Sequence, residues 1–139
     1  MSTQLWALAA AGAVVLVAAG LELWRSSHAR GRALGLTAPT AAGDTEPYIL
    51  YFTGDSCSVC RTHQEPALAK LVGVRIDKVD AIAERELADR FHVYTLPTTV
   101  VMSGEGKSLQ VNYGYAPATK LERQLSEARR GELRNAATA

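Results

Sequence analysis

The chain's only two cysteines, Cys57 and Cys60, are separated by two residues in the stretch TGDSCSVCRTH. A C-x-x-C pair has three chemical uses: a redox couple, half of a metal site, or a small structural crosslink. A crosslink between residues this close closes too small a loop to stabilise a fold much. The redox and metal interpretations are therefore the two that need to be weighed.

A metal site would need more ligands than this pair supplies. His63 extends the pattern to C-x-x-C-x-x-H, and His92 follows later in the chain. Structural zinc takes four nitrogen or sulfur ligands. We expect His63, a turn beyond Cys60, to face solvent, and His92 is typical of a side chain that interacts with a helix C-terminus. The element order described below also differs from that of C-x-x-C copper carriers, so we predict no metal and no other cofactor.

The redox interpretation depends on where the pair lies. Residues 48–52, YILYF, are typical of a buried strand, and Leu68 and Leu71 follow the pair at helical spacing. Cys57 is therefore expected at a helix N-terminus, where free N–H groups favour a thiolate. Cys60, one turn later, is close enough to form a disulfide with it. Cys57 would attack a substrate disulfide as the nucleophile, and Cys60 would resolve the mixed disulfide.

A second strand and a second helix are predicted after the helix that carries the pair. Pro66 is expected to kink or divide that first helix. Residues 74–79 are predicted as the second strand, and Asp80 as the N-cap of a helix that runs to about Arg90. The buried face of this helix is predicted to comprise Ala83, Leu87 and Phe91.

The rest of the domain is predicted as a hairpin and a final helix. Residues 98–102 and 109–113 are two strands joined by the glycine-containing turn 103–106, and a helix follows from Ala118 to about Arg130. Its buried face is predicted to comprise Leu121, Leu125 and Ala128. A crossover helix implies parallel pairing of the first two strands, whereas the hairpin adds antiparallel strands. We therefore predict an α/β fold with a mixed central sheet of about four strands flanked by helices.

The order strand, C-x-x-C, helix and then Thr-Leu-Pro-Thr (95–98) resembles the thioredoxin superfamily over roughly residues 47–130. In that family the proline has a cis peptide bond and faces the cysteine pair, and the adjacent backbone pairs with the substrate chain. The resemblance assigns these substrate-binding roles to Pro97, predicted to be cis, and to Leu96. Gly114, in YGYAP, resembles the glycine that lines the same groove. A thioredoxin-like fold and a thiol–disulfide oxidoreductase are what the resemblance implies.

The chain also departs from the pattern of thioredoxin itself, Trp-Cys-Gly-Pro-Cys. Ser56 precedes the first cysteine, and Ser58-Val59 separates the two. Tyr51 occupies the position of the buried acid on the preceding strand. Pro66 follows the second cysteine by six residues, where the family's helix proline follows it by five. The resemblance therefore identifies no proton acceptor for the resolving thiol, and the redox potential does not carry over.

The N-terminal segment is predicted to span a membrane. No polar side chain occurs from Leu5 to Leu21, and residues 4–24 match the roughly 20 helical residues that cross a hydrocarbon core. Trp6 and Trp24 mark its two ends, where indole rings prefer the interface. A cleaved signal peptide is the alternative. The absence of Lys and Arg before Leu5, and the length of the apolar run, favour a retained anchor.

Arginines follow the predicted span and indicate its orientation. The positive-inside rule places Arg25, Arg30 and Arg32 in the cytoplasm, so the domain is predicted on the cytoplasmic side of a bacterial-type inner membrane, with an extracytoplasmic domain as the alternative. The following segment is rich in Ala, Gly, Ser and Thr and contains Pro39, which is typical of a flexible tether. The predicted organisation is an anchor (1–24), a flexible linker (25–46), a thioredoxin-like domain (47–130) and a frayed tail (131–139).

These predictions together indicate a membrane-tethered thiol–disulfide oxidoreductase. The formal net charge is +1, so no basic field suggests nucleic acid as a partner. Because the cytoplasm is reducing, reduction of protein disulfides is the expected direction. No nucleotide, flavin or metal motif occurs, so electrons are expected from an upstream dithiol partner. The alternative is a non-catalytic binding or scaffold module of the same fold, although binding alone would require neither cysteine.

Overall fold

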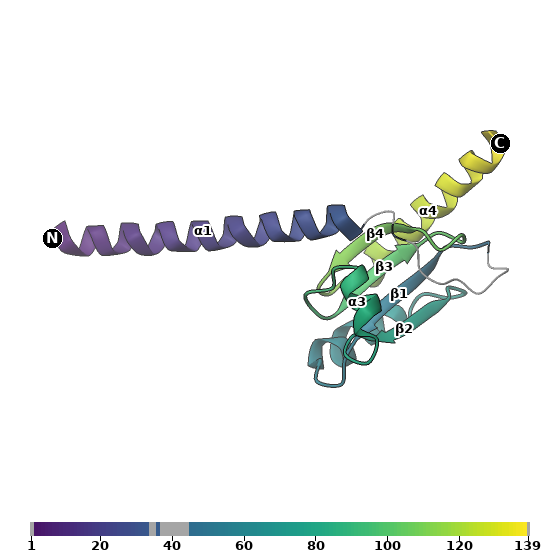
Figure 1. Cartoon of the computed structure of the whole chain (residues 1–139), viewed down its shortest axis with the longest axis horizontal. Helices are drawn as coiled ribbons and strands as arrows, with labels where there is room; N and C mark the ends of the chain where they lie inside the picture. Colours follow the sequence, from purple (N-terminus) through teal and green to yellow (C-terminus); the bar gives the residue numbers. More distant parts are fainter. Residues whose placement is uncertain (1, 34–35, 37–44, 139) are drawn as a thin grey trace.

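A four-stranded mixed sheet lies at the centre of the domain that follows the N-terminal helix (Figure 1). In this computed structural model, which describes residues 2–33, 36 and 45–138, the strands are β1 (Tyr48–Thr53), β2 (Ile76–Asp80), β3 (Thr98–Met102) and β4 (Ser108–Tyr113). Their order in the sheet is β2-β1-β3-β4. β1 pairs in parallel with β2 and antiparallel with β3, and β3 pairs antiparallel with β4. The predicted mixed sheet is confirmed.

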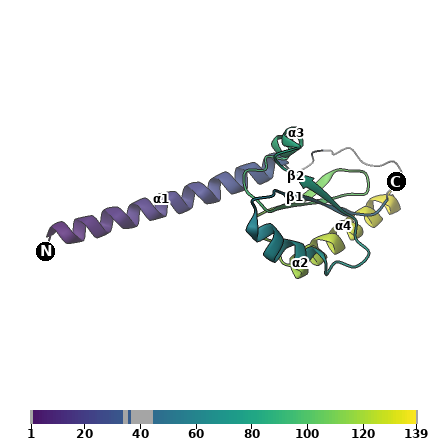
Figure 2. The same cartoon turned by 90° about the horizontal axis from the view of Figure 1, so that it is seen from below.

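Helices cover both faces of this sheet. They are the π-helical turn η1 (Cys60–Gln64), α2 (Glu65–Leu68), α3 (Arg85–Arg90) and α4 (Ala118–Thr138), whereas α1 (Ser2–Ala33) precedes the domain and projects away from it (Figure 1). Figure 2 shows α3 on one side of the strands and α2 and α4 on the other. Pro66, predicted to kink or divide its helix, lies in the first turn of α2, directly after the π-helical turn. The helix is therefore divided at the expected place.

β1 is buried along its whole length because it lies between two other strands and between two helical layers. Its alternate side chains enter two separate cores. Leu50 and Phe52 pack on the α3 side, where the rings of Phe52 and Phe91 are 5.8 Å apart. Ile49 and Tyr51 pack on the opposite side, where the core includes Cys60, Leu68, Leu121 and Leu125.

The final helix extends further than predicted. Leu121, Leu125 and Ala128 are buried, as the helical pattern predicts. Residues 131–138, predicted as part of a frayed tail, are helical to Thr138. The carboxylate of Glu132 accepts a hydrogen bond from the amide of Gly104 at 2.8 Å, which ties the helix end to the β3–β4 turn. Ala139 lies outside the described residues.

The helix after β2 begins later than predicted. Asp80 was expected to cap a helix starting at once, but α3 begins only at Arg85. Asp80 Oδ1 instead accepts hydrogen bonds from the amides of Ile82 (2.8 Å) and Ala83 (3.0 Å), which shape a turn over residues 81–84. Ala83, predicted on the buried face, is exposed as a result. An aspartate can satisfy two amides in a turn as readily as in a helix, so its cap signal did not distinguish the two.

The turn after β2 should lose stability in acid. These two backbone hydrogen bonds lower the pKa of Asp80 below its ordinary value, so the ionised carboxylate stabilises the fold at neutral pH. We expect Asp80→Ala to lower the melting temperature at pH 7, and the difference from wild type to shrink from about pH 3.9, the ordinary aspartate pKa, and to disappear as pH falls through the lower pKa that Asp80 has in the folded chain. Thermal unfolding from pH 7 to 2.5 measures this. Asp89→Ala, an exposed control in α3, should have little effect at either pH.

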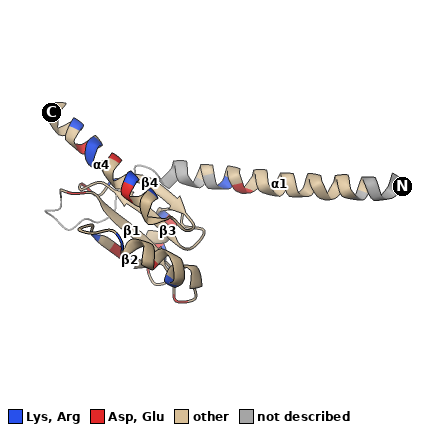
Figure 3. Cartoon of the chain, turned by 180° about the vertical axis from the view of Figure 1, so that it is seen from behind, with Lys and Arg blue, Asp and Glu red and all other residues tan. Residues whose placement is uncertain are grey.

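α1 is long and apolar enough to cross a membrane. The stretch Leu8–Arg25 lies outside the folded core along its whole length. Its only charged side chains are Glu22 and Arg25, both close to its C-terminal end (Figure 3). An apolar helix near an N-terminus is also typical of a signal sequence, and length and composition do not separate the two.

The helix continues well beyond the apolar stretch. Residues 25–33, predicted as the start of a flexible linker, are helical to Ala33. Local contacts between successive turns explain this: Glu22 pairs with Arg25 at 3.7 Å, and the rings of Trp24 and His28 are 4.9 Å apart. No proline interrupts these residues. Residues 34–35 and 37–44 of the predicted linker, including Pro39, lie outside the described residues.

The C-terminal part of α1 and the residue Leu36 contact the domain along β4. The guanidinium carbon of Arg25 lies 5.9 Å from the centre of the Tyr94 ring, which in turn lies 4.7 Å from the Tyr113 ring. The carbonyl of Leu36 accepts a hydrogen bond from the amide of Ser108 at 2.8 Å. The domain is therefore held against the end of α1 at two points.

Candidate functional site

The two cysteines lie in the connection between β1 and the helix that follows it. The amide of Cys57 donates a hydrogen bond to the carbonyl of Gly54 at 3.0 Å, which closes a turn directly after Thr53. Residues 58–59 are already helical. Cys57 therefore lies at a helix N-terminus, where the sequence predicts it.

A disulfide bond joins Cys57 to Cys60, with sulfur atoms 2.10 Å and Cα atoms 5.3 Å apart. The two residues differ in exposure: Cys57 is partly exposed, whereas Cys60 is 0% exposed. The amide of Cys60 also donates a hydrogen bond to Cys57 Sγ at 3.2 Å. Cys57 is therefore the more accessible of the two residues and has an N–H donor beside its sulfur, whereas the core encloses Cys60.

The Leu96–Pro97 peptide bond is cis. Leu96 lies against the turn that precedes the cysteines. Its Cδ1 is close enough to Gly54 that a Cβ added there would lie 3.2 Å from it. The carbonyl of Pro97 accepts a hydrogen bond from the amide of Gly114 at 2.8 Å. Gly114 has a φ of +83°, which other residues adopt only with strain. The structure thus brings the cysteine turn, Leu96, Pro97 and Gly114 into one connected region.

Gln64, for which no role was predicted, ties the cysteine helix to the loop after β4. Its side chain is 0% exposed. Its Nε2 donates to the carbonyl of Ala116 at 3.0 Å, and its Oε1 accepts from the amide of Ala116 at 2.9 Å. One side chain therefore satisfies both backbone groups of a buried residue, two positions beyond Gly114.

The comparison with known protein families agrees with the geometry of the cysteine pair and the cis proline. A family model for a thioredoxin-like domain matches residues 35–129, more than half of the chain. The chain belongs to the thioredoxin-like family. Among curated protein sequences, none matches it significantly.

Solved thioredoxins share this thioredoxin-like fold. The thioredoxin of Fasciola hepatica is 29% identical with a TM-score of 0.52, and the match covers 61% of this chain and 83% of the other. Mitochondrial thioredoxin 3 of Saccharomyces cerevisiae, in its oxidised form, is 25% identical with a TM-score of 0.52, over 60% and 79% of the two chains. Thioredoxin-2 of the malaria parasite has a TM-score of 0.54 and 23% identity, over 65% and 99%, and shows the fold alone.

The six-residue spacing between Cys60 and Pro66 has a structural counterpart in the π-helical turn. The amide of Glu65 donates to the carbonyl of Cys60, five residues earlier, rather than to the residue four earlier as in an α-helix. Each π-type ring contains one residue more than an α-type ring. The turn therefore absorbs the additional residue relative to the family's five-residue spacing, and it is here that Gln64 points into the core.

Tyr51 takes the place of the family's buried acid. Its side chain is buried in the same core as Cys60. Burial raises the pKa of the Tyr51 hydroxyl above its ordinary value, so the group stays protonated at neutral pH. Tyr51 therefore does not supply the carboxylate that this position provides in thioredoxin.

A polar cleft of about 430 Å³ opens beside the cysteine turn. Across it, Lys78 Nζ lies 2.7 Å from Glu65 Oε1, and this contact raises the pKa of Lys78. Arg61 donates a hydrogen bond to the carbonyl of Asp55 on the same side. The other lining residues are Thr53, Gly54, Asp80 and Glu84. This cleft gives water and charged groups access to the side of the cysteine helix.

The two histidines considered as metal ligands have other contacts. His63 is exposed; its Nδ1 lies 2.7 Å from the hydroxyl of Thr62, and its ring meets the Tyr115 ring edge-on at 5.9 Å. His92 lies two residues after the end of α3 with a φ of 53°, and its amide donates to the carbonyl of Asp89. Within the described part of the chain, no three His, Cys, Asp or Glu side chains gather at one point.

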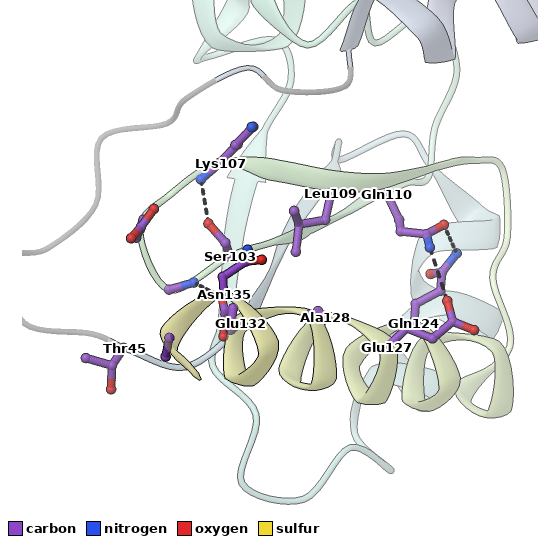
Figure 4. Close-up of a pocket in the computed structure, with 14 residues that line it drawn as sticks. Thr45, Ser103, Lys107, Leu109, Gln110, Gln124, Glu127, Ala128, Glu132 and Asn135 are labelled. Carbon is purple, nitrogen blue, oxygen red and sulfur yellow. Dashed lines mark hydrogen bonds between the residues drawn. The ribbon is translucent and has the colours of Figure 1, made fainter. Parts of the chain in front are cut away.

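A second, larger cleft lies away from the cysteines. It has a volume of about 740 Å³ and separates the C-terminal half of α4 from the β3–β4 hairpin (Figure 4). Its polar wall includes Gln110, which accepts a hydrogen bond from Gln124 Nε2 at 3.4 Å and donates one to Glu127 at 3.3 Å (Figure 4). Because the β3–β4 turn is at the opposite end of the strands from the cysteine turn, this cleft takes no part in the site described above.

Proposed function

We propose that this chain is a membrane-tethered thiol–disulfide oxidoreductase that reduces protein disulfides. The observation that carries the proposal is the partly exposed Cys57 and the buried Cys60, joined in a disulfide at a helix N-terminus of a thioredoxin-like fold. A crosslink of this size adds little stability, so a structural role does not account for it. Reversible exchange does account for the unequal exposure of the two residues.

In the reduced enzyme Cys57 is the nucleophile. The Cys60 amide, 3.2 Å from its sulfur, and the free amides of the helix start favour the thiolate. The Cys57 thiolate attacks one sulfur of a substrate disulfide, forms a mixed disulfide, and releases the other sulfur as a thiolate that takes a proton from water. Cys60 then loses its proton and attacks Cys57, the mixed disulfide breaks, and the substrate leaves with both thiols reduced. The two electrons come from the dithiol, which ends as the Cys57–Cys60 disulfide.

Leu96, Pro97 and Gly114 are assigned to substrate binding. The cis peptide bond turns the chain beside the cysteine loop, and Pro97 has no N–H to compete with the thiols. The hydrogen bond from Gly114 to Pro97 holds the two segments together on one side of the disulfide. An extended substrate chain would lie against this backbone with its disulfide over Cys57.

Turnover of insulin with dithiothreitol tests this function. We expect the wild-type chain to accelerate insulin reduction, and Cys57→Ser to abolish the acceleration because no other sulfur of the site is exposed. Insulin precipitation, followed by turbidity, is the measurement. Equal rates for wild type and Cys57→Ser would instead support the second candidate, a non-catalytic binding or scaffold module of the same fold.

The proposal also includes a membrane anchor, a dithiol electron donor and a cytoplasmic location for the domain. The apolar helix would anchor the chain through residues 4–24, an upstream dithiol protein would re-reduce Cys57–Cys60, and nucleic acid has no part in the function. The positive charge of Arg25, Arg30 and Arg32 favours a cytoplasmic domain at a bacterial-type inner membrane. In an extracytoplasmic location, the alternative, the same site would serve oxidation or isomerisation.

Protease treatment of sealed right-side-out and inverted vesicles should settle the sidedness. We expect the domain to be digested in inverted vesicles, which expose their cytoplasmic face, and to be protected in right-side-out ones. A chain recovered without residues 1–24 would point to a cleaved signal peptide in place of an anchor. Digestion in right-side-out vesicles would overturn the cytoplasmic assignment.

A further inference from the structure

Four loops meet at the end of the sheet where β1 finishes. β2 is parallel to β1 and also ends there, whereas the antiparallel β3 begins there and β4 ends there. We call this the redox end and define it by the segments 54–59, 81–84, 92–97 and 114–117. It carries the disulfide, the cis peptide bond and the loop that Gln64 holds.

The redox end is also the most apolar exposed part of the domain. Six large apolar side chains are exposed on residues 45–138, and four of them lie at this end. These four are Val59, Ile82, Tyr94 and Tyr115. Two are tyrosines, a residue type that is enriched where protein meets the membrane–water interface.

α1 leaves the domain from this same end. Arg25 lies over Tyr94 at the redox end, whereas Leu36 bonds to Ser108, at the opposite end of β4. The part of α1 after Arg25 therefore runs along β4, away from the redox end. The preceding part of the helix must project outward past the redox end, and both Figure 1 and Figure 2 show α2 on the side of the domain that faces the N-terminus of α1.

We propose that α1 holds the redox end against the bilayer surface, so that the substrates are disulfides in the membrane-proximal segments of membrane proteins. This inference depends on the proposed redox function and on the proposed anchor. The apolar stretch ends at Arg25, and Arg25 contacts Tyr94, three residues before Pro97. In this orientation only the contact between Arg25 and Tyr94 separates the edge of the hydrocarbon core from the loop that contains Pro97.

The substrate that fits a redox end held against the bilayer is a polypeptide segment that emerges from the same bilayer. Such a segment reaches Cys57 from the side, along the membrane plane, whereas a bulky soluble protein meets the lipid surface on its approach. Segments next to a membrane span are enriched in Trp and Tyr, whose rings can pack on Val59, Ile82, Tyr94 and Tyr115. The exchange itself is the one given above: the dithiol supplies two electrons, and the membrane-proximal disulfide becomes two thiols.

The rate of disulfide reduction at two distances from the membrane tests this proposal. Two synthetic single-span peptides are placed with the full-length chain in phosphatidylcholine–phosphatidylglycerol liposomes. The near peptide carries a disulfide loop next to its span, and the far peptide carries the same loop on an added eleven-residue helix, about 16 Å further out. With dithiothreitol as donor and insulin as a soluble control, we expect the near peptide to be reduced about tenfold faster than the far one, since the tether sets the effective concentration.

An insertion between Trp24 and Arg25 moves the domain without changing the site. Eleven helical residues make close to three full turns, so they lift the domain by about 16 Å and keep the same face turned to the membrane. We expect this variant to prefer the far peptide, and eleven Gly-Ser residues at the same point to remove the preference. The same helical insert after Ala139 is the matched control and should behave as wild type.

The outcomes separate the two proposals. If the wild-type chain reduces neither insulin nor either peptide, the redox function itself is refuted. Insulin turnover with equal rates for the near and far peptides would refute only the orientation, as would a helical-insert variant that turns over insulin and still prefers the near peptide. The wild-type comparison decides the question even if an inserted chain fails to fold.

Discussion

A chain carrying Cys60→Ser is expected to remain covalently attached to its substrate through Cys57. The first exchange needs only the exposed sulfur and its amide donor, whereas release of substrate needs the buried Cys60 to attack. Serine fits the buried position but does not attack a disulfide. Turnover should therefore fall by about 100-fold or more, the scale of losing a covalent catalytic group, while attachment persists.

Non-reducing electrophoresis and mass spectrometry measure this trapping. Incubation with a disulfide-bonded protein should give a species with the summed mass of the two chains, which dithiothreitol separates. Cys57→Ser is the matched control and should give little adduct, because its remaining thiol is buried. Equal adducts from the two variants would mean that the exposure difference does not set the order of attack, and would contradict the assignment of Cys57 as nucleophile.

The sequence predicted the central part of the fold because its signals there are local and strong. β1 and β3 are short runs of apolar, aromatic and β-branched residues, and β4 alternates polar and apolar residues. Their predicted ranges differ from the observed ones by at most one residue at an end. The buried face of α4 follows from helical spacing alone. Parallel and antiparallel pairing then followed from the lengths of the connections.

The boundaries that depend on tertiary contacts were predicted less well. Nothing local distinguishes the turn at Asp80 from a helix cap, since the same carboxylate serves both. Residues 131–138 are polar and near the C-terminus, yet Glu132 is held by the distant Gly104. Residues 25–33 contain glycine and serine, but contacts between neighbouring turns and with the domain keep them helical.

The candidate site divides in the same way. Cys57 and Cys60 are identified by spacing and position, and Leu96, Pro97 and Gly114 by the family resemblance. Gln64 was missed, because a glutamine between a histidine and a glutamate looks like part of a solvent-facing helix turn. The only advance signal was the spacing of six residues from Cys60 to Pro66, which the π-helical turn now explains. Its partner, Ala116, is 52 residues away, beyond any local pattern.

Replacing Gln64 with methionine should cost more stability than any other single change among the side-chain hydrogen bonds described above. Methionine matches the shape of glutamine but leaves the amide and the carbonyl of Ala116 buried without partners. Each unpaired buried group costs about 1–3 kcal/mol, so loss of partners for both groups should lower the free energy of unfolding by about 2–6 kcal/mol. Urea unfolding of the oxidised chain measures this change.

The same substitution should also weaken substrate binding, because Ala116 anchors the loop that contains Gly114 and the exposed Tyr115. We expect KM for insulin to rise while the reactivity of Cys57 toward a small alkylating reagent stays near wild type, since the cysteine turn keeps its own hydrogen bonds. Gln110→Met is the matched control: its amide bonds at 3.3 and 3.4 Å near the surface and should cost less than about 1 kcal/mol. Equal losses of stability in the two variants, or an unchanged KM in Gln64→Met, would mean that the hydrogen bonds to Ala116 do not hold the substrate loop in place.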